Sequence, residues 1–151
     1  MPQGSVLGPL LYTLYIVPLG EIIKKHSLNY HFYADDTQLY LAVEPSDIHD
    51  LIYKVENCVK EVIEWMKNNK LKCNDDKTEA MLINPKNFNV DVTELGIGNE
   101  NVVFADCAKN LGFIIDKDLS MESHVNNLCK TVYLEIRRLK QLSKFVNRSS
   151  L

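Results

Sequence analysis

Residues 31–43 of the chain read HFYADDTQLYLAV, with two adjacent acids between apolar and β-favouring residues. The Tyr, Phe, Leu, Thr and Val residues on both sides predict two short strands, and the central acidic pair predicts the turn that joins them into a hairpin. Aspartate is a common turn residue in its own right, because its side chain bonds nearby backbone. The hairpin alone therefore leaves two interpretations open: a solvated turn, or a metal site built on Asp35 and Asp36.

Length and charge set limits on both interpretations. With 151 residues, of which 46% are hydrophobic, the chain is one domain or a large piece of one. The net charge of -3 argues against a general nucleic-acid coat, but the charge is uneven. Residues 1–50 carry six acids and two bases, which gives -4, whereas residues 101–151 carry five acids and eight bases, which gives +3. The positive charge is therefore concentrated near the carboxyl end.

The cysteines and the uncharged first twenty residues bear on the compartment. The four cysteines form no C-x-x-C pair, so neither a zinc knuckle nor a disulfide scaffold is indicated. Residues 1–20 raise the question of a signal peptide or a membrane span, but proline and glycine interrupt this stretch and no base precedes it. We expect an intracellular chain, cytoplasmic or nuclear, whose first helix is mostly buried in protein.

Apolar periodicity predicts the remaining elements. Helices are expected after the glycine-rich start up to residues 24–26, from about residue 46 to 69, and from about 120 to 145. Strands are expected at residues 78–83, 90–97, 101–104 and 109–115, with a hairpin turn at 98–99. Because helices and strands mix without regular βαβ alternation, the sequence predicts an α+β fold with an antiparallel sheet and flanking helices.

A metal site at the hairpin tip would have a definite chemistry. Two neighbouring carboxylates at a turn can share one concave site, and their mutual repulsion calls for a cation. Hard oxygen ligands select Mg²⁺ or Mn²⁺, and two such ions about 4 Å apart serve phosphoryl or nucleotidyl transfer. This interpretation predicts a nucleoside triphosphate, a growing strand and a third carboxylate.

The stretch PQGSVLGP at residues 2–9 is a second, independent indication. Gly4 and Gly8 permit a close approach of backbone, and they precede a helix whose N-terminal amides favour phosphate. The alternative is a flexible lead into a helix. The stretch matches neither G-x-G-x-x-G nor a P-loop.

Together, PQGSVLGPLLYTLY and HFYADDTQLY resemble two successive palm motifs of the reverse transcriptases of non-LTR (LINE-type) retrotransposons. WMKNNKLKCNDDKTEAML is similar to the next palm motif of this family, and NLGFIIDKDLSMESHV is similar to its primer grip. The resemblance implies a partial polymerase palm over residues 1–118. It also implies the start of the thumb, a basic thumb-like helix, over residues 119–151.

The resemblance also implies roles for the residues of the hairpin. Asp35 and Asp36 match the catalytic, metal-binding pair of the family. Tyr33 and Ala34 complete its YADD box and fall among the positions that contact nucleotide and template.

Further roles fall on residues outside the hairpin. Gln3 and Gly4 match positions that contact the incoming nucleotide and the templating base. Lys77 matches a lysine that assists the departure of pyrophosphate, although a lysine after an acidic turn is also typical of a solvated surface. Gly112 would form the tight turn that presents backbone to the primer end.

The basic C-terminal segment completes the implied set. The resemblance implies that this segment contacts phosphates along a template–primer duplex through Lys130, Arg137, Arg138, Lys140 and Lys144. The equal alternative is that these residues form an ordinary solvated face.

The implied cofactor is Mg²⁺ or Mn²⁺, and the implied partners are an RNA template, a DNA primer and deoxynucleoside triphosphates. The first catalytic aspartate of the family lies upstream of the PQG motif, where this chain begins, so the metal site is expected to be incomplete and the isolated chain inactive. The strand that carries this aspartate packs beside the hairpin, so an open sheet edge and uncovered apolar surface are expected. The alternatives are a non-catalytic nucleic-acid-binding or interaction protein derived from a retroelement, and a chain without retained function.

Overall fold

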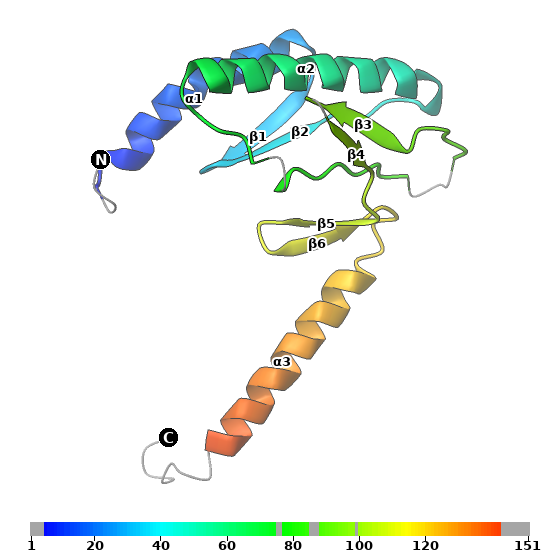
Figure 1. Cartoon of the computed structure of the whole chain (residues 1–151). Coiled ribbons are helices and arrows are strands. Elements are labelled where there is room, and N and C mark those ends of the chain that lie inside the picture. Colours follow the sequence, from blue (N-terminus) through cyan, green and yellow to red (C-terminus); the bar gives the residue numbers. More distant parts are fainter. Residues whose placement is uncertain (1–4, 75–76, 85–87, 99, 143–151) are drawn as a thin grey trace. The chain divides into compact units, whose positions relative to one another are not determined.

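The computed structural model of the chain describes residues 5–74, 77–84, 88–98 and 100–142. These residues form an α+β structure with three long helices and three antiparallel hairpins (Figure 1). The predicted α+β class with antiparallel pairing is confirmed. Its strands pair two by two, in three separate two-stranded sheets, within the described ranges.

The chain divides into two compact units. The first unit comprises Met1–Thr78 and Phe88–Val103, and the second comprises Glu79–Asn87 and Phe104–Leu151. In the first unit the elements follow in the order α1 (Gly8–Lys25), β1 (Asn29–Tyr33), β2 (Asp36–Tyr40), a short 3₁₀ turn (Pro45–Asp47), α2 (Ile48–Asn68), β3 (Glu94–Ile97) and β4 (Glu100–Val103). In the second unit they are β5 (Cys107–Asn110), β6 (Phe113–Asp116) and α3 (Glu122–Leu142).

Helix α1 begins and ends where local chemistry favours it. A proline fits the first helical turn, where an amide hydrogen has no partner within the helix, and Lys24 and Lys25 complement the dipole in the last turn. The chain then leaves the helix through Ser27, whose φ is 59°. One face of the helix is buried, but Leu10 and Leu14 on the outer side are 58% and 60% exposed. The prediction that this helix is mostly buried is therefore wrong for its outer face, which no described element covers.

Helix α1 is apolar over most of its length, which raises the question of a membrane span. In the part of the chain that the structure describes, no helix combines the length and the apolar character needed to cross a bilayer.

The core of the first unit lies between the two helices and the β1–β2 hairpin (Figure 1). Leu19 and Ile23 of α1 meet Cys58 and Val62 of α2, and Leu28 joins them from the connection to β1. Burial raises the pKa of the Cys58 thiol to about 11, so this cysteine is a core residue and not a nucleophile at neutral pH. The apolar side of the hairpin packs on this cluster through Tyr30, Phe32, Leu39 and Leu41.

Strands β3 and β4 attach to α2 through a polar contact. The Gly96 amide of β3 donates a hydrogen bond of 2.8 Å to Oε1 of Glu56 on α2. The predicted hairpin of residues 90–97 and 101–104 is confirmed, with its first strand shortened to Glu94–Ile97. The shortening follows from pairing, because β4 has only four residues, Glu100–Val103, to serve as partners.

Two other predicted strands differ in the structure. Residues 78–83 form a single bridge, Ala80 with Phe104, instead of a strand. The predicted strand 109–115 is a hairpin of β5 and β6, because Leu111 and Gly112 adopt φ values of 47° and 85° and reverse the chain. Positive φ at both central residues is typical of the tight two-residue turn that matches strand twist.

Helix α3 is anchored to the β5–β6 hairpin at its first turn. The Asp116 carboxylate, 7% exposed, accepts hydrogen bonds from the amides of Ser120 (2.8 Å) and Met121 (2.7 Å). The ring of His124 stacks on Phe113 with centroids 3.8 Å apart, and its Nδ1 accepts a 3.3 Å hydrogen bond from the Ile114 amide. The helix is described as far as Leu142, so the predicted end near residue 145 lies outside the described residues.

Substitution of Gly20 by alanine tests the close contact between α1 and β1. A Cβ at Gly20 would approach Cζ of Tyr30 to 2.8 Å, and the Tyr30 ring is itself packed against Phe32. We expect Gly20→Ala to lower the free energy of unfolding by about 1–3 kcal/mol, measured by urea denaturation. Gly8→Ala is the matched control, because a Cβ there meets nothing closer than 3.9 Å. Equal stability of the two variants would contradict this packing.

Asp116→Asn tests the anchor of α3. The amide of Ser120, and after it that of Met121, holds the pKa of the Asp116 carboxyl below its ordinary value of 3.8. The stability that this carboxylate contributes is therefore complete above that value and is lost as the pH falls through the lowered pKa. We expect hydrogen exchange of the first turn of α3 to accelerate at acid pH in the wild type, while Asp116→Asn loses this pH dependence. Asp118→Asn, at an exposed neighbour, should keep the wild-type profile.

Candidate active site

A cavity of about 750 Å³ lies between α1 and the β1–β2 hairpin, entirely within the first unit. On the α1 side its lining begins at Gly8 and Pro9 and includes Tyr12, and on the hairpin side it includes Ala34 and Asp35. The segment that follows the PQG motif and the tip of the hairpin thus face the same space. Gln3 and Gly4 lie outside the described residues.

The hairpin tip is formed by Ala34 and Asp35, not by the acidic pair. Asp36 is the first residue of β2 and pairs with Tyr33, the last residue of β1. Ala34 makes the turn possible by adopting a φ of 52°, a left-handed conformation that is unusual for a residue other than glycine. The turn therefore lies one residue earlier in the chain than the predicted turn, which was centred on both acids.

Because of this shift, the side chains of Asp35 and Asp36 have different surroundings. Asp35 lines the cavity, whereas Asp36 is not among its described lining residues. Both side chains are exposed, as is Tyr33 at the end of β1. The side chains of neighbouring residues project in different directions where a strand begins. The Asp35 carboxylate therefore faces the α1 side, whereas the Asp36 carboxylate projects from the first position of β2 in another direction.

Tyr12 marks the α1 side of the cavity. Burial, and secondarily the negative charge of Asp35, raises the pKa of the Tyr12 phenol above its ordinary value of 10.0. The phenol therefore stays protonated at neutral pH and can donate a hydrogen bond into the cavity. The sequence motifs assign no role to Tyr12, although its position four residues after Gly8 places it one helical turn into α1.

The chemistry of the site can be compared with the needs of a divalent cation. Asp35 and Asp36 offer the hard oxygen atoms that Mg²⁺ and Mn²⁺ prefer. In the described ranges, however, no three His, Cys, Asp or Glu side chains gather closely enough to hold a metal ion. Among the described residues, the donors fit such a cation in kind and fall short in number.

Lys77 lies on a separate part of the first unit. It follows Asn74, whose carbonyl accepts hydrogen bonds from the Lys77 amide (3.1 Å) and from the Thr78 hydroxyl (3.2 Å). Lys77 is exposed and is not among the described lining residues of the Asp35 cavity. The structure therefore does not bring Lys77 to the Asp35 cavity.

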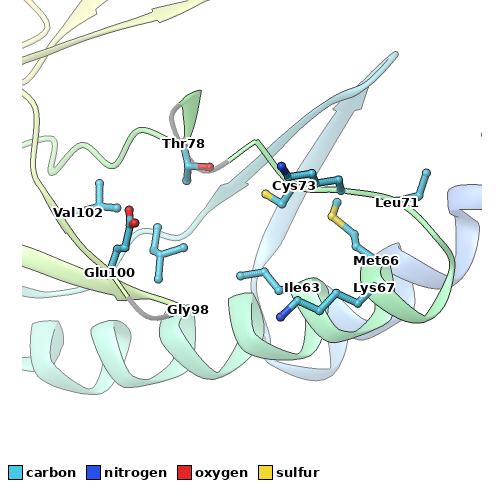
Figure 2. Close-up of a pocket in the computed structure, with 11 residues that line it drawn as sticks. Ile63, Met66, Lys67, Leu71, Cys73, Thr78, Gly98, Glu100 and Val102 are labelled. Carbon is cyan, nitrogen blue, oxygen red and sulfur yellow. The ribbon is translucent and has the colours of Figure 1, made fainter.

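A second cavity of about 310 Å³ lies beside the segment that leads to Lys77. Figure 2 shows Ile63, Met66 and Lys67 reaching it from α2, while Cys73 and Thr78 border it from the loop. Part of its lining, including Met66, Cys73 and Thr78, belongs to the segment that resembles the third palm motif.

The remaining predicted residues belong to the second unit. Gly112, with its φ of 85°, occupies the tight β5–β6 turn, and a Cβ there would meet nothing within 4 Å. The predicted turn is confirmed, while its contact with a primer remains a prediction. On α3 the exposed cations are Lys130, Arg137, Arg138 and Lys140; Lys144 lies outside the described residues. Arg138 forms an ion pair with Glu135 one turn earlier.

Comparisons with known proteins agree with these motifs. The sequence model of the family described as "Reverse transcriptase (RNA-dependent DNA polymerase)" matches residues 1–115. A fruit-fly protein, the "Probable RNA-directed DNA polymerase from transposon BS" of Drosophila melanogaster, is 29% identical over 99% of this chain and 17% of its own length. The "Probable RNA-directed DNA polymerase from transposon X-element" of the same organism is 26% identical over 85% of this chain and 14% of its own length.

These matches confirm the resemblance to LINE-type reverse transcriptases drawn from the sequence motifs. The chain spans about a sixth of the length of these curated relatives. No solved structure matches the chain.

The pKa of Tyr12 tests whether Asp35 faces α1. We expect Asp35→Asn to lower the pKa of the Tyr12 phenol, because a negative charge is removed, without restoring the ordinary value of 10.0, because burial remains. Asp36→Asn, which removes the same charge one residue further along, should leave this pKa unchanged. The measurement is an NMR titration of ring-labelled tyrosine, with Tyr12→Phe to assign the signal. Equal shifts in the two variants would show that both carboxylates face Tyr12.

Proposed function

Because this chain belongs to the reverse transcriptase (RNA-dependent DNA polymerase) family, we propose that it forms part of the palm, over residues 1–118, and the start of the thumb, over residues 119–151, of a transposon-encoded RNA-directed DNA polymerase. The parent enzyme would copy an RNA template by extending a DNA primer with deoxynucleoside triphosphates. It would act in the cytoplasm or the nucleus, where its template is found. The observation that carries the proposal is the cavity shared by Asp35 of the YADD box and the helix that follows the PQG motif.

Asp35 and Asp36 would together hold Mg²⁺ or Mn²⁺, with further ligands from other groups. Reverse transcriptases as a family depend on divalent metal ions. When bound, such an ion stabilises the negative charge that develops on the phosphates during nucleotidyl transfer. The cavity position of Asp35 supports a direct role for this carboxylate. The place of Asp36 at the start of β2 supports a role from the outer side of the hairpin.

The opposite wall of the cavity would bind the nucleotide. Gly8 and Pro9 lie in the first turn of α1, where the positive end of the helix dipole favours phosphate. No acidic residue lies in that first turn to repel a triphosphate. The Tyr12 hydroxyl, kept protonated by its surroundings, would donate a hydrogen bond to the nucleotide. Gln3 and Gly4 would complete this wall, with Tyr33 and Ala34 at the tip of the hairpin.

The other motif residues would act on the primer and the duplex. Gly112 would let the β5–β6 turn approach the primer end closely, because its α-carbon carries no side chain and its surroundings are open. Lys77 would assist the departure of pyrophosphate, which requires movement of the exposed segment that carries it. Lys130, Arg137, Arg138, Lys140 and Lys144 would contact phosphates along the template–primer duplex.

Metal binding to the isolated chain tests the assignment of the acidic pair. We expect weak binding of Mn²⁺, followed by paramagnetic broadening of backbone NMR signals, to be centred on Ala34 and Asp35. Asp35→Asn and Asp36→Asn should each weaken the affinity at least about tenfold, because each removes an oxygen ligand and a negative charge.

Asp47→Asn is the matched control, since Asp47 is an exposed acid in the 3₁₀ turn of the same unit. It should retain the affinity of the wild type. An affinity that is the same in the wild type and in both hairpin variants would remove the proposed metal site.

A further inference from the structure

The first two turns of α1 form one wall of the Asp35 cavity, through residues such as Gly8 and Tyr12. Every residue of these two turns is exposed or half-buried. The core contacts of α1 lie further along the helix, at Leu19 and Ile23. The position of the cavity wall therefore depends on contacts outside the core cluster.

A proline separates these two turns from the half of the helix that the core holds. Pro18 lies inside α1 and lacks the amide hydrogen that would bond to the carbonyl of Leu14, four residues earlier. The hydrogen-bond ladder is therefore interrupted between the cavity wall and the core residues. A proline at such a position weakens a helix and lets it bend. The first half of α1 thus needs support of its own.

Tyr15 lies just before this interruption and contacts the end of α2. Its hydroxyl donates a 2.6 Å hydrogen bond to the Asn69 carbonyl, and its ring lies against Trp65 with centroids 6.1 Å apart. The two helices run antiparallel, because Lys25 at the end of α1 forms its ion pair with Glu61, further back in α2. The turns of α1 before Tyr15 therefore extend beyond the end of α2 (Figure 1).

The acceptor of the Tyr15 hydrogen bond is itself held in place. Asn69 follows the last residue of α2, where backbone carbonyls have no partner within a helix. Its side-chain Nδ2 donates a 2.8 Å hydrogen bond to the Trp65 carbonyl, and its amide donates one of 3.0 Å to the same oxygen. The chain then reverses at Lys70, whose φ is 58°, in the left-handed ending that is common for helices. Tyr15 thus bonds to a carbonyl that the end of α2 keeps at a defined position.

We propose that Tyr15 is a positioning residue of the Asp35 cavity, because it joins the first half of α1 to the end of α2 and so sets where the wall with Gly8 and Tyr12 lies relative to Asp35. Tyr15 is not among the described lining residues of the cavity, so it acts through the wall and not by contact with a ligand. The consequence for nucleotide binding rests on the proposed function, whereas the placement of the wall does not.

Tyr15→Phe tests the hydrogen bond, since it removes the hydroxyl and keeps a ring against Trp65. We expect hydrogen exchange of backbone amides 11–17 to accelerate about fivefold, the size expected for one lost hydrogen bond, while amides 19–25 change less than about twofold. Tyr53→Phe is the matched control, because Tyr53 is a tyrosine of α2 that is 69% exposed. It should leave both sets of amides unchanged.

The titration of Tyr12 tests whether the effect reaches the cavity. In Tyr15→Phe the Tyr12 phenol becomes more solvated and lies farther from Asp35, so we expect its pKa to fall toward 10.0. The decrease that Asp35→Asn causes in this pKa should be at least about halved in the Tyr15→Phe background. A tyrosine that served only overall stability would lower the unfolding midpoint of the chain and leave this coupling intact.

Pro18→Ala provides a rescue. Alanine supplies the amide hydrogen for the Leu14 carbonyl, so the helix becomes continuous across its two halves. In this background, Tyr15→Phe should change the exchange of amides 11–17 by less than about twofold and should leave the pKa of Tyr12 where Pro18→Ala alone places it.

Three results would overturn the positioning role of Tyr15. They are equal acceleration of both halves of α1, a pKa of Tyr12 that Tyr15→Phe leaves unchanged, and the same response to Tyr53→Phe.

Binding of dATP with Mn²⁺ to the full chain, followed by NMR, tests the consequence for the nucleotide separately. We expect the affinity of Tyr15→Phe to be at least about threefold lower than that of the wild type, and equal affinities would overturn this consequence. Absence of dATP binding by the wild type would overturn the nucleotide role proposed for the wall. Amide exchange and the titration of Tyr12 would still decide whether Tyr15 positions it.

Discussion

The first unit depends on the register of the β1–β2 hairpin against the helices. Tyr30 and Phe32 of β1 face the core formed with Leu19 and Ile23 of α1, while Asn29, His31 and Tyr33 face outward. A slip of one residue would exchange these two sets, because side chains alternate along a strand. The core therefore selects one pairing, Tyr33 with Asp36, and this pairing leaves Ala34 and Asp35 as the turn. The position of Asp35 opposite Tyr12 is therefore a consequence of the packing of Tyr30 and Phe32, which line the same cavity.

The same packing explains why the two acids are not equivalent. The pairing of Tyr33 with Asp36 leaves a two-residue loop of Ala34 and Asp35, so Asp36 begins the next strand. Ala34 takes the left-handed conformation, so Asp35 is directed to the α1 side and Asp36 is held by pairing. In the proposed polymerase, Asp35 would hold the metal ion from the turn and Asp36 from the first position of β2. Such an arrangement requires ligands from elsewhere, in keeping with the absence of a third donor among the described residues.

The second unit is organised by polar contacts instead of a large core. Asp116 ends β6 and caps the beginning of α3, and the stacked pair of Phe113 and His124 adds the ring contact. These contacts join the turn proposed as a primer grip to the helix proposed as the start of the thumb. They fix the start of α3, whose residues 125–142 are all exposed, whereas α2 buries Cys58 and Val62 of its apolar stripe.

The sequence by itself determined the family, the α+β class, the existence of the long helices and of the hairpins at residues 31–43 and 94–103, because these follow from local periodicity and from motifs read along the chain. It also indicated the acidic pair. Only the tertiary structure decided that Asp35 is the acid that faces the cavity and that Tyr12 lies opposite it. It also decided that residues 107–116 form a hairpin and not one strand, and that the outer face of α1 is exposed. These features depend on which apolar side chains find partners and on a left-handed residue such as Ala34 or Leu111, and neither is encoded in the local pattern.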